Sequence, residues 1–125
     1  MIGIDIVAVG RIEKFIERQG KERTLKRFFD KDEILLLKNT TSIAGFYAAK
    51  EAVSKALGVG IGKICQFHDI KIYKDDKKAP YFTLSKHLID TYEIKDSSLS
   101  ITHHNGFAIA VAAIEGKKSD KVLFH

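Results

Sequence analysis

Residues 1–12 read MIGIDIVAVGRI, and the interpretation of the whole chain starts from them. The isoleucines at positions 2, 4 and 6 alternate, so they predict a buried strand with Asp5 on its opposite face. An ionised carboxylate on a largely apolar strand loses hydration and is seldom buried without compensation. A cation, a metal ion or a set of backbone N–H groups could compensate it, and which of these does so bears directly on the function.

The length of 125 residues suits about one domain with a single core, so we expect residues 1–125 to form one domain. Hydrophobic content of 45% and charged content of 30% are typical of a folded soluble protein. No run approaches the roughly 20 apolar residues that span a bilayer, and the N-terminus lacks a signal-type segment. The single Cys65 cannot form an internal disulfide. These features favour a cytoplasmic protein that does not contact membranes.

The formal net charge is +5, and basic residues are concentrated between positions 11 and 27. On a helix, one face would carry Arg11, Lys14, Phe15 and Arg18. Such a face attracts acidic proteins, nucleic acids or phosphorylated small molecules, and charge alone does not choose among them. One alternative is a non-catalytic basic module that binds RNA or another polyanion, using aromatic residues expected to be exposed at positions 73, 81 and 82. The absence of an RNP-like strand and of a GXXG clamp weighs against nucleic acid.

Periodicity predicts helices and strands in a definite order. We expect helices over 12–20, 24–38 (one or two), 40–58 and 85–93, and strands over 66–74 and 80–84. Asn105-Gly106 between two apolar runs predicts a two-residue hairpin. One strand, then helices, then mostly antiparallel strands favour an α+β fold: a small domain whose mostly antiparallel sheet packs on a long central helix. The tail after Glu115 is expected to be loosely held.

The strongest helix is TTSIAGFYAAKEAVSKALG, residues 40–58. Thr41 or Ser42 is expected to cap its start, and Gly58 suits its end. Lys50 falls within the apolar stripe of this helix, and we expect its ammonium to reach the surface.

Glu51 and Lys55 lie four residues apart on this helix, a spacing typical of a weak exposed ion pair. The small alanines nearby favour a second interpretation, in which both side chains lie at the rim of a closely packed site. Gly58 and Gly60 suit a helix cap and a loop, and they would also let a phosphate approach backbone N–H donors. Asp5 and Glu51 are the best metal candidates, because hard carboxylate oxygens suit Mg²⁺.

His103 and His104 are neighbours in the predicted hairpin and therefore point to opposite faces. The sequence contains no HExxH spacing and no Cys/His cluster that would indicate zinc. It also contains no nucleophile-elbow serine, and Cys65 has no context typical of a catalytic thiol.

Four motifs follow one another along the chain: GIDIVAVGRI, AAKEAVSKALGVGIG, FHDIKIYKD with a later proline, and SITH before an alanine-rich strand. Together they resemble the bacterial holo-(acyl-carrier-protein) synthases, the small 4′-phosphopantetheinyl transferases of fatty-acid biosynthesis, over residues 3–115. The resemblance implies transfer of the phosphopantetheine arm of coenzyme A to a serine of an acidic apo-acyl carrier protein, releasing adenosine 3′,5′-bisphosphate. It also implies the 4′-phosphopantetheinyl transferase fold and a homotrimer with active sites between neighbouring subunits.

The resemblance assigns roles to matching residues. Asp5 and Glu51 would bind Mg²⁺, and Lys55 would join them as a catalytic residue that approaches the coenzyme A phosphates. Further coenzyme contacts would come from Gly58, Gly60, Pro80, His103 and His104. Carrier-docking positions would be Arg11, Lys14 and Arg18. The base that takes the serine proton is open between Glu51, Asp5 and a metal-bound water.

Two departures from the family pattern affect the site. Relatives often carry an arginine and an aromatic before AAKEA, where this chain has Phe46 and Tyr47. We expect the arginine's contact to be lost, or supplied by Lys50 or by a basic residue from another loop. The usual Gly-Lys-Pro turn reads Lys-Ala-Pro at 78–80.

A broader-range transferase for polyketide or peptide carriers is disfavoured, because those relatives usually join two such units in a longer chain.

Overall fold

The computed structural model describes residues 1–117, so most of the tail expected to be loosely held lies outside the described residues. Its elements are β1 (Ile2–Ala8), α1 (Val9–Gln19), α2 (Lys21–Phe28), α3 (Lys31–Ile34), α4 (Thr40–Ala56), the 3₁₀ turn η1 (Phe67–Asp69), β2 (Ile70–Lys74), β3 (Pro80–Leu84), α5 (Lys86–Thr91), β4 (Asp96–His104) and β5 (Phe107–Glu115). This order confirms the α+β class predicted from the sequence. Among residues 1–117, no helix is both long and apolar enough to cross a membrane.

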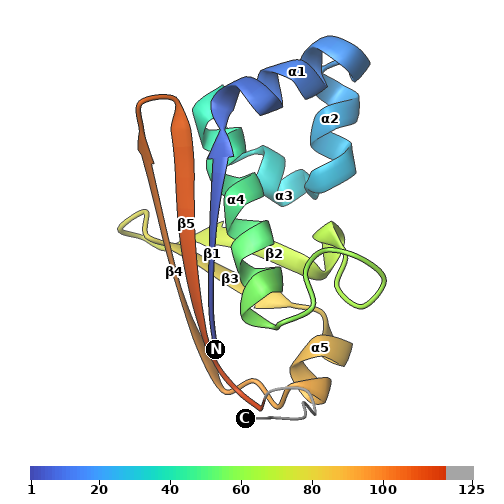
Figure 1. Ribbon diagram of the computed structural model, residues 1–125, viewed down its shortest axis with the longest axis vertical. Helices are drawn as coiled ribbons and strands as arrows, with labels where there is room; N and C mark the ends of the chain where they lie inside the picture. The colour runs from blue at the N-terminus through green and yellow to red at the C-terminus, as the bar shows by residue number, and fades with distance from the viewer. Residues whose placement is uncertain (118–125) are drawn as a thin grey trace, which may run out of the picture.

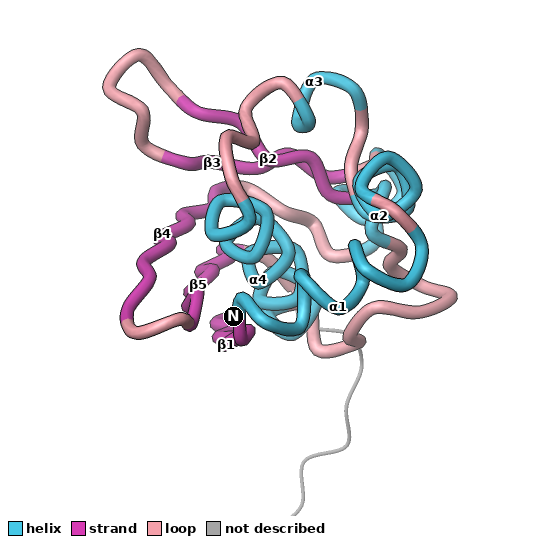
Figure 2. The backbone as a smooth tube through the Cα atoms, turned by 90° about the horizontal axis from the view of Figure 1, so that it is seen from above, coloured by secondary structure: helices cyan, strands magenta, loops and turns pink. Residues whose placement is uncertain are grey.

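Helix α4 lies at the centre of the molecule, between two antiparallel sheets (Figures 1 and 2). One sheet has the strand order β1-β5-β4, and the other is the hairpin β2-β3. Helices α1 and α2 cover the end of the molecule where β1 runs into α1 (Figure 1). The predicted β4-β5 hairpin is confirmed, because Asn105 and Gly106 form its turn with φ of 48° and 79°.

Strand β1 packs very closely on α4, and Gly3 makes this possible. A Cβ added at Gly3 would lie 1.9 Å from the Ala52 carbonyl oxygen and 2.5 Å from the Ala56 amide nitrogen. Gly3 and Val7 therefore face inward, whereas the isoleucines at positions 2, 4 and 6 face outward with 75%, 60% and 59% exposure. The prediction of a buried strand is wrong for this isoleucine face.

Replacing Gly3 by alanine is expected to lower the free energy of unfolding by about 1–3 kcal/mol or more. Backbone atoms of α4 obstruct the added methyl, so strand and helix must move apart. Urea unfolding at fixed protein concentration measures the change. Gly62→Ala is the matched control, since a Cβ there meets nothing within 4 Å. Equal midpoints for the two variants would contradict the close contact.

Helix α4 begins after Asn39, not at Thr41 or Ser42 as predicted. The Asn39 side chain accepts from the Ser42 amide at 2.8 Å, and the Ser42 hydroxyl accepts from the Asn39 amide at 3.0 Å. Ser42 thus forms the second half of a reciprocal cap. At the other end, Gly58 follows the helix with φ of 82°, as the sequence predicts.

Lys50 is fully buried, so the expectation that its ammonium reaches the surface is wrong. Its Nζ lies 2.9 Å from Glu33 Oε1 and also donates to the carbonyls of Phe28 and Phe67. Glu33 Oε2 accepts from the Ile72 amide at 2.9 Å. Burial lowers the pKa of Lys50, while the Glu33 carboxylate opposes that shift. This buried pair connects α4 to α3, β2 and η1.

Candidate functional site

Asp5 lies on the inward face of β1, and the Lys55 ammonium compensates its charge. Lys55 Nζ lies 2.8 Å from Asp5 Oδ1 and 3.4 Å from the Ile4 carbonyl oxygen. The Asp5 side chain is only 14% exposed. The two predicted site residues are therefore brought together from β1 and α4, and Lys55 pairs with Asp5 instead of with Glu51.

Glu51 is half-buried on α4, close enough to Asp5 for their charges to interact. Burial raises the pKa of the Glu51 carboxyl, and the Asp5 charge raises it further. The charges of Lys55 and Arg11 and the nearby Tyr47 hydroxyl act in the opposite direction. Two like charges thus share a partly desolvated site and are only partly compensated within the chain.

Arg11 and Tyr47 border the carboxylates. The Arg11 guanidinium lies 5.3 Å from the centroid of the Tyr47 ring. Burial raises the pKa of Tyr47, and Glu51 raises it too, whereas Arg11 lowers it. The sequence analysis did not select Tyr47, although it precedes Glu51 by one helical turn and that spacing places both on one face.

The predicted docking face lies on α1, where Arg11, Lys14 and Arg18 are all exposed. Phe15 is half-buried instead, with its ring centroid 5.5 Å from that of Phe28. The face therefore offers positive charge, while the phenylalanine that we grouped with it packs inward.

Gly58 and Gly60 follow Lys55 in the chain, with φ of 82° and 68°. Their amides already donate within the chain, to the carbonyls of Lys55 and Ser54 respectively. In this conformation the two glycines can offer a phosphate close approach, but their N–H groups are occupied.

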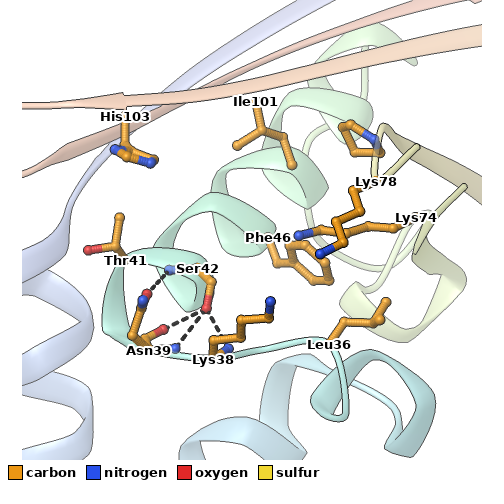
Figure 3. A pocket seen from close by; sticks show the side chains of 11 residues that line it. Leu36, Lys38, Asn39, Thr41, Ser42, Phe46, Lys74, Lys78, Ile101 and His103 are labelled. Atoms are coloured by element: carbon orange, nitrogen blue, oxygen red, sulfur yellow. Dashed lines mark hydrogen bonds between the residues drawn. The ribbon is translucent and has the colours of Figure 1, made fainter. Parts of the chain in front are cut away.

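The remaining predicted coenzyme residues separate into two groups. Pro80 and His103 line a cavity of about 420 Å³ beside the N-terminal half of α4 (Figure 3). His104 does not line this cavity, because it follows His103 on the strand and faces the other side of the sheet.

Phe46 lines this cavity, at the position where the resemblance leads us to expect an arginine. Lys50 cannot replace that arginine, because its ammonium is buried against Glu33. Lys74 of β2 does approach the position, with Nζ 5.9 Å from the Phe46 ring centroid. A basic residue from another segment is thus present there.

The carboxylate site and the cavity lie on opposite flanks of α4. Asp5 pairs with Ala110, and Ala110 pairs with Ile101, so the three form one row across β1, β5 and β4. Neighbouring strands are about 4.8 Å apart, which places the ends of the row about 10 Å apart. Gly45 of α4 packs against Ile101, and Lys55 contacts Asp5 at the other edge.

The donor chemistry of the carboxylate site fits Mg²⁺. Within residues 1–117, no three His, Cys, Asp or Glu side chains form a metal-binding group. Mg²⁺ typically uses one or two carboxylates and completes its shell with waters and substrate phosphates. Asp5 and Glu51, as two hard oxygen donors with incompletely compensated charge, suit that mode.

The sequence model of the 4′-phosphopantetheinyl transferase superfamily matches residues 1–112. The chain belongs to this superfamily. It is 53% identical to the holo-[acyl-carrier-protein] synthase of Wolinella succinogenes over 119 residues, which are 95% of this chain and 100% of that protein. The predicted resemblance to holo-acyl-carrier-protein synthases is thereby confirmed.

Solved structures agree with this assignment. The Helicobacter pylori holo-[acyl-carrier-protein] synthase in complex with coenzyme A superposes with a TM-score of 0.88 and 52% identity, covering 92% of this chain and 100% of that chain. The Neisseria meningitidis enzyme superposes with a TM-score of 0.82 and 30% identity, covering 91% of this chain and 96% of that chain. The predicted phosphopantetheinyl transferase fold is confirmed.

Proposed function

We propose that this chain is a holo-acyl-carrier-protein synthase of fatty-acid biosynthesis. It transfers the 4′-phosphopantetheine group of coenzyme A to a serine of apo-acyl carrier protein and releases adenosine 3′,5′-bisphosphate. The observation that carries the proposal is the convergence of Asp5, Glu51 and Lys55 from two distant segments, in a chain of this superfamily.

The reaction forms a bond between the serine oxygen and the β-phosphorus of coenzyme A and breaks the bond to the bridging oxygen of the diphosphate. Asp5 and Glu51 would hold Mg²⁺, which when bound neutralises diphosphate charge. The Lys55 ammonium is half-exposed beside Asp5 and supplies positive charge where the leaving bisphosphate gains negative charge. Arg11, whose charge acts on Glu51, adds positive charge on the α1 side of the site.

Incubation of the purified chain with coenzyme A, Mg²⁺ and apo-carrier tests the activity directly. The carrier should gain the mass of one phosphopantetheine group, and the gain should require both coenzyme A and Mg²⁺. Salt-sensitive RNA binding without any mass gain would support the polyanion-binding alternative instead.

The structure offers little support for that alternative. Of the three aromatic residues expected to be exposed, Phe82 is buried and Tyr81 is 46% exposed. Tyr73 is half-buried and stacks on Tyr81 with ring centroids 5.2 Å apart. Three expectations stay predictions: the protein binds no nucleic acid, it binds no membrane, and it is located in the cytoplasm.

The active form in this proposal is the homotrimer that the resemblance implies, and an apolar sheet face that a single chain leaves uncovered supports an interface between copies. The exposed large apolar residues on the outward face of β1 and β5 are Ile2, Ile4, Ile6, Phe107 and Val111. An apolar patch of this kind typically marks an interface. Further copies of the chain would cover it. The active sites between neighbouring subunits that the resemblance implies would then combine the carboxylates of one copy with the cavity of another.

Substituting Ile4 by glutamate is expected to dissociate the trimer and abolish transfer. The new charge would have to be buried against a neighbouring apolar face. Light scattering on the eluting protein measures the mass, and the carrier assay measures transfer. Thr83→Glu, at an exposed position of β3, is the control and should remain trimeric and active. A monomeric wild type with full activity would contradict the shared site.

Charge reversal on α1 should weaken carrier binding. For Arg18→Glu we expect the carrier KM to rise about tenfold, with kcat largely retained and with a reduced salt dependence. Arg11→Glu should also lower kcat, because Arg11 borders Glu51. Lys95→Glu, an exposed change remote from α1, serves as control. An unchanged carrier KM in both arginine variants would remove this face from the docking surface.

A further inference from the structure

Arg11, in the first turn of α1, lies over two aromatic rings. Its guanidinium carbon is 5.3 Å from the centroid of the Tyr47 ring and 5.7 Å from that of the Phe15 ring. Phe15 follows Arg11 by one turn of α1, a spacing that places both on one face of that helix. Tyr47 belongs to α4, which packs against α1 (Figure 2). The guanidinium therefore contacts one ring from each helix, at the place where α1 and α4 meet.

The two rings, and not a carboxylate, hold Arg11 in this position. Within residues 1–117, Arg11 forms no ion pair at 4 Å or less, and it is exposed. An exposed arginine otherwise samples many rotamers, and a partner that binds it must first restrict that freedom. Attraction between the guanidinium and the ring faces restricts it in advance. The N–H donors of the guanidinium stay available for carboxylates of a partner.

Tyr47 is the ring that serves Arg11 alone. The Tyr47 side chain is 4% exposed, and its ring centroid lies 5.4 Å from that of Phe67, so the core fixes its place. Phe15 also lies 5.9 Å from the Arg27 guanidinium and thus contacts two arginines. Of the cations in the described part of the chain, only Arg11 lies over the Tyr47 ring. A change at Tyr47 therefore tests the position of Arg11 specifically.

We propose that Tyr47 is a positioning residue for carrier docking, whose ring holds the Arg11 guanidinium ready for an acidic group of the carrier protein. This inference rests on the proposed function and assigns a buried residue to it. The ring and not the hydroxyl has this role, because the attraction for a cation comes from the ring face. The charge of Arg11 also acts on Glu51, so the docking face extends to the carboxylate site at this residue.

Steady-state kinetics with apo-acyl carrier protein as the varied substrate test this role. In Tyr47→Leu, the carrier KM should rise about three- to tenfold, because Arg11 must then be ordered during docking. The KM for coenzyme A should stay unchanged, and Tyr47→Phe, which keeps the ring, should keep the carrier KM. Adding Tyr47→Leu to Arg11→Gln should raise the carrier KM no further, since both changes remove the same interaction.

Phe67→Leu is the matched control for loss of a ring. Phe67 belongs to the same aromatic cluster as Tyr47, but no cation of the described residues lies over its ring. Thermal unfolding should show that Phe67→Leu and Tyr47→Leu are both destabilised, whereas only Tyr47→Leu should have a raised carrier KM. An equal rise in Phe67→Leu would mean that Tyr47 acts only through the stability of the core, and would overturn the proposal.

Two further readouts require no turnover. In NMR spectra, ring currents should shift the side-chain signals of Arg11 in the wild type and in Tyr47→Phe, and the shift should diminish in Tyr47→Leu. Fluorescence anisotropy of labelled apo-carrier should show weaker binding to Tyr47→Leu. Unshifted Arg11 signals in the wild type, or an unchanged carrier KM in Tyr47→Leu, would overturn the role of Tyr47. A wild type that shows the shift and binds the carrier through the ring, but transfers nothing, would contradict the proposed function and support the Tyr47 assignment.

Discussion

Replacing Glu51 by glutamine is expected to lower the rate of carrier modification by about two to three orders of magnitude. The substitution keeps the shape of the side chain but removes one of the two charges that would hold Mg²⁺. The same change should leave the fold intact or slightly more stable. Because burial and Asp5 raise the pKa of Glu51, its ionised form is disfavoured in the folded protein, and the neutral amide removes that penalty.

Opposite effects on activity and stability distinguish a functional role of Glu51 from a structural one. Transfer is followed by the mass of the carrier at saturating coenzyme A and Mg²⁺, and stability by thermal unfolding. Glu115→Gln, at an exposed glutamate at the end of β5, should change neither quantity. Near-normal transfer by Glu51→Gln in the presence of Mg²⁺ would refute the assignment of the carboxylate site.

Local sequence patterns predicted most of the secondary structure, because the residues concerned determine the conformation of their own backbone. Asn105-Gly106 adopts the positive φ angles that its hairpin needs, and β3 spans 80–84 as predicted. The strand expected over 66–74 was only partly right, since Phe67–Asp69 forms a 3₁₀ turn before β2. The Asp69 side chain accepts from the Gln66 amide at 2.8 Å, which favours a turn at this point.

Alternation alone could not reveal which face of β1 is buried. The larger side chains, at positions 2, 4 and 6, suggested the inner face, yet Gly3 and Val7 occupy it. Close approach to α4 outweighs side-chain size, because a glycine lets backbones touch where an isoleucine would separate them. In the proposed homotrimer, neighbouring copies would cover the isoleucine face, and alternation within one chain does not distinguish such a face from one buried inside the chain.

The candidate site was predicted as a set of residues but not as a set of contacts. Asp5, Glu51 and Lys55 do converge, yet the spacing on α4 suggested a Glu51–Lys55 pair where the structure has an Asp5–Lys55 pair. The partner of Lys55 is 50 residues away in the chain, so only tertiary structure could supply it. Tyr47 was overlooked for a related reason, since only the tertiary structure brings Arg11 of α1 next to its ring.

Lys50→Met is expected to lower the free energy of unfolding by about 3–5 kcal/mol. Methionine fills much of the same space, but it leaves the Glu33 carboxylate buried without its cationic partner. It also removes the donor to the carbonyls of Phe28 and Phe67. Lys26→Met is the matched control, because Lys26 forms only an exposed pair with Glu22 and should change stability by less than about 1 kcal/mol.

A double-mutant cycle with Glu33→Gln separates the ion pair from simple loss of packing. If the unpaired Glu33 charge causes most of the destabilisation in Lys50→Met, Glu33→Gln should restore part of the lost free energy of unfolding. The coupling energy between the two substitutions should then be about 1–3 kcal/mol. The Glu33 side chain also accepts from the amides of Asp30 and Ile72, so Glu33→Gln alone should be destabilising and full recovery is not expected. Urea unfolding at one fixed protein concentration supplies all four values. Strictly additive losses would mean that Lys50 and Glu33 act independently, and that burial, not their pairing, determines the cost of replacing either.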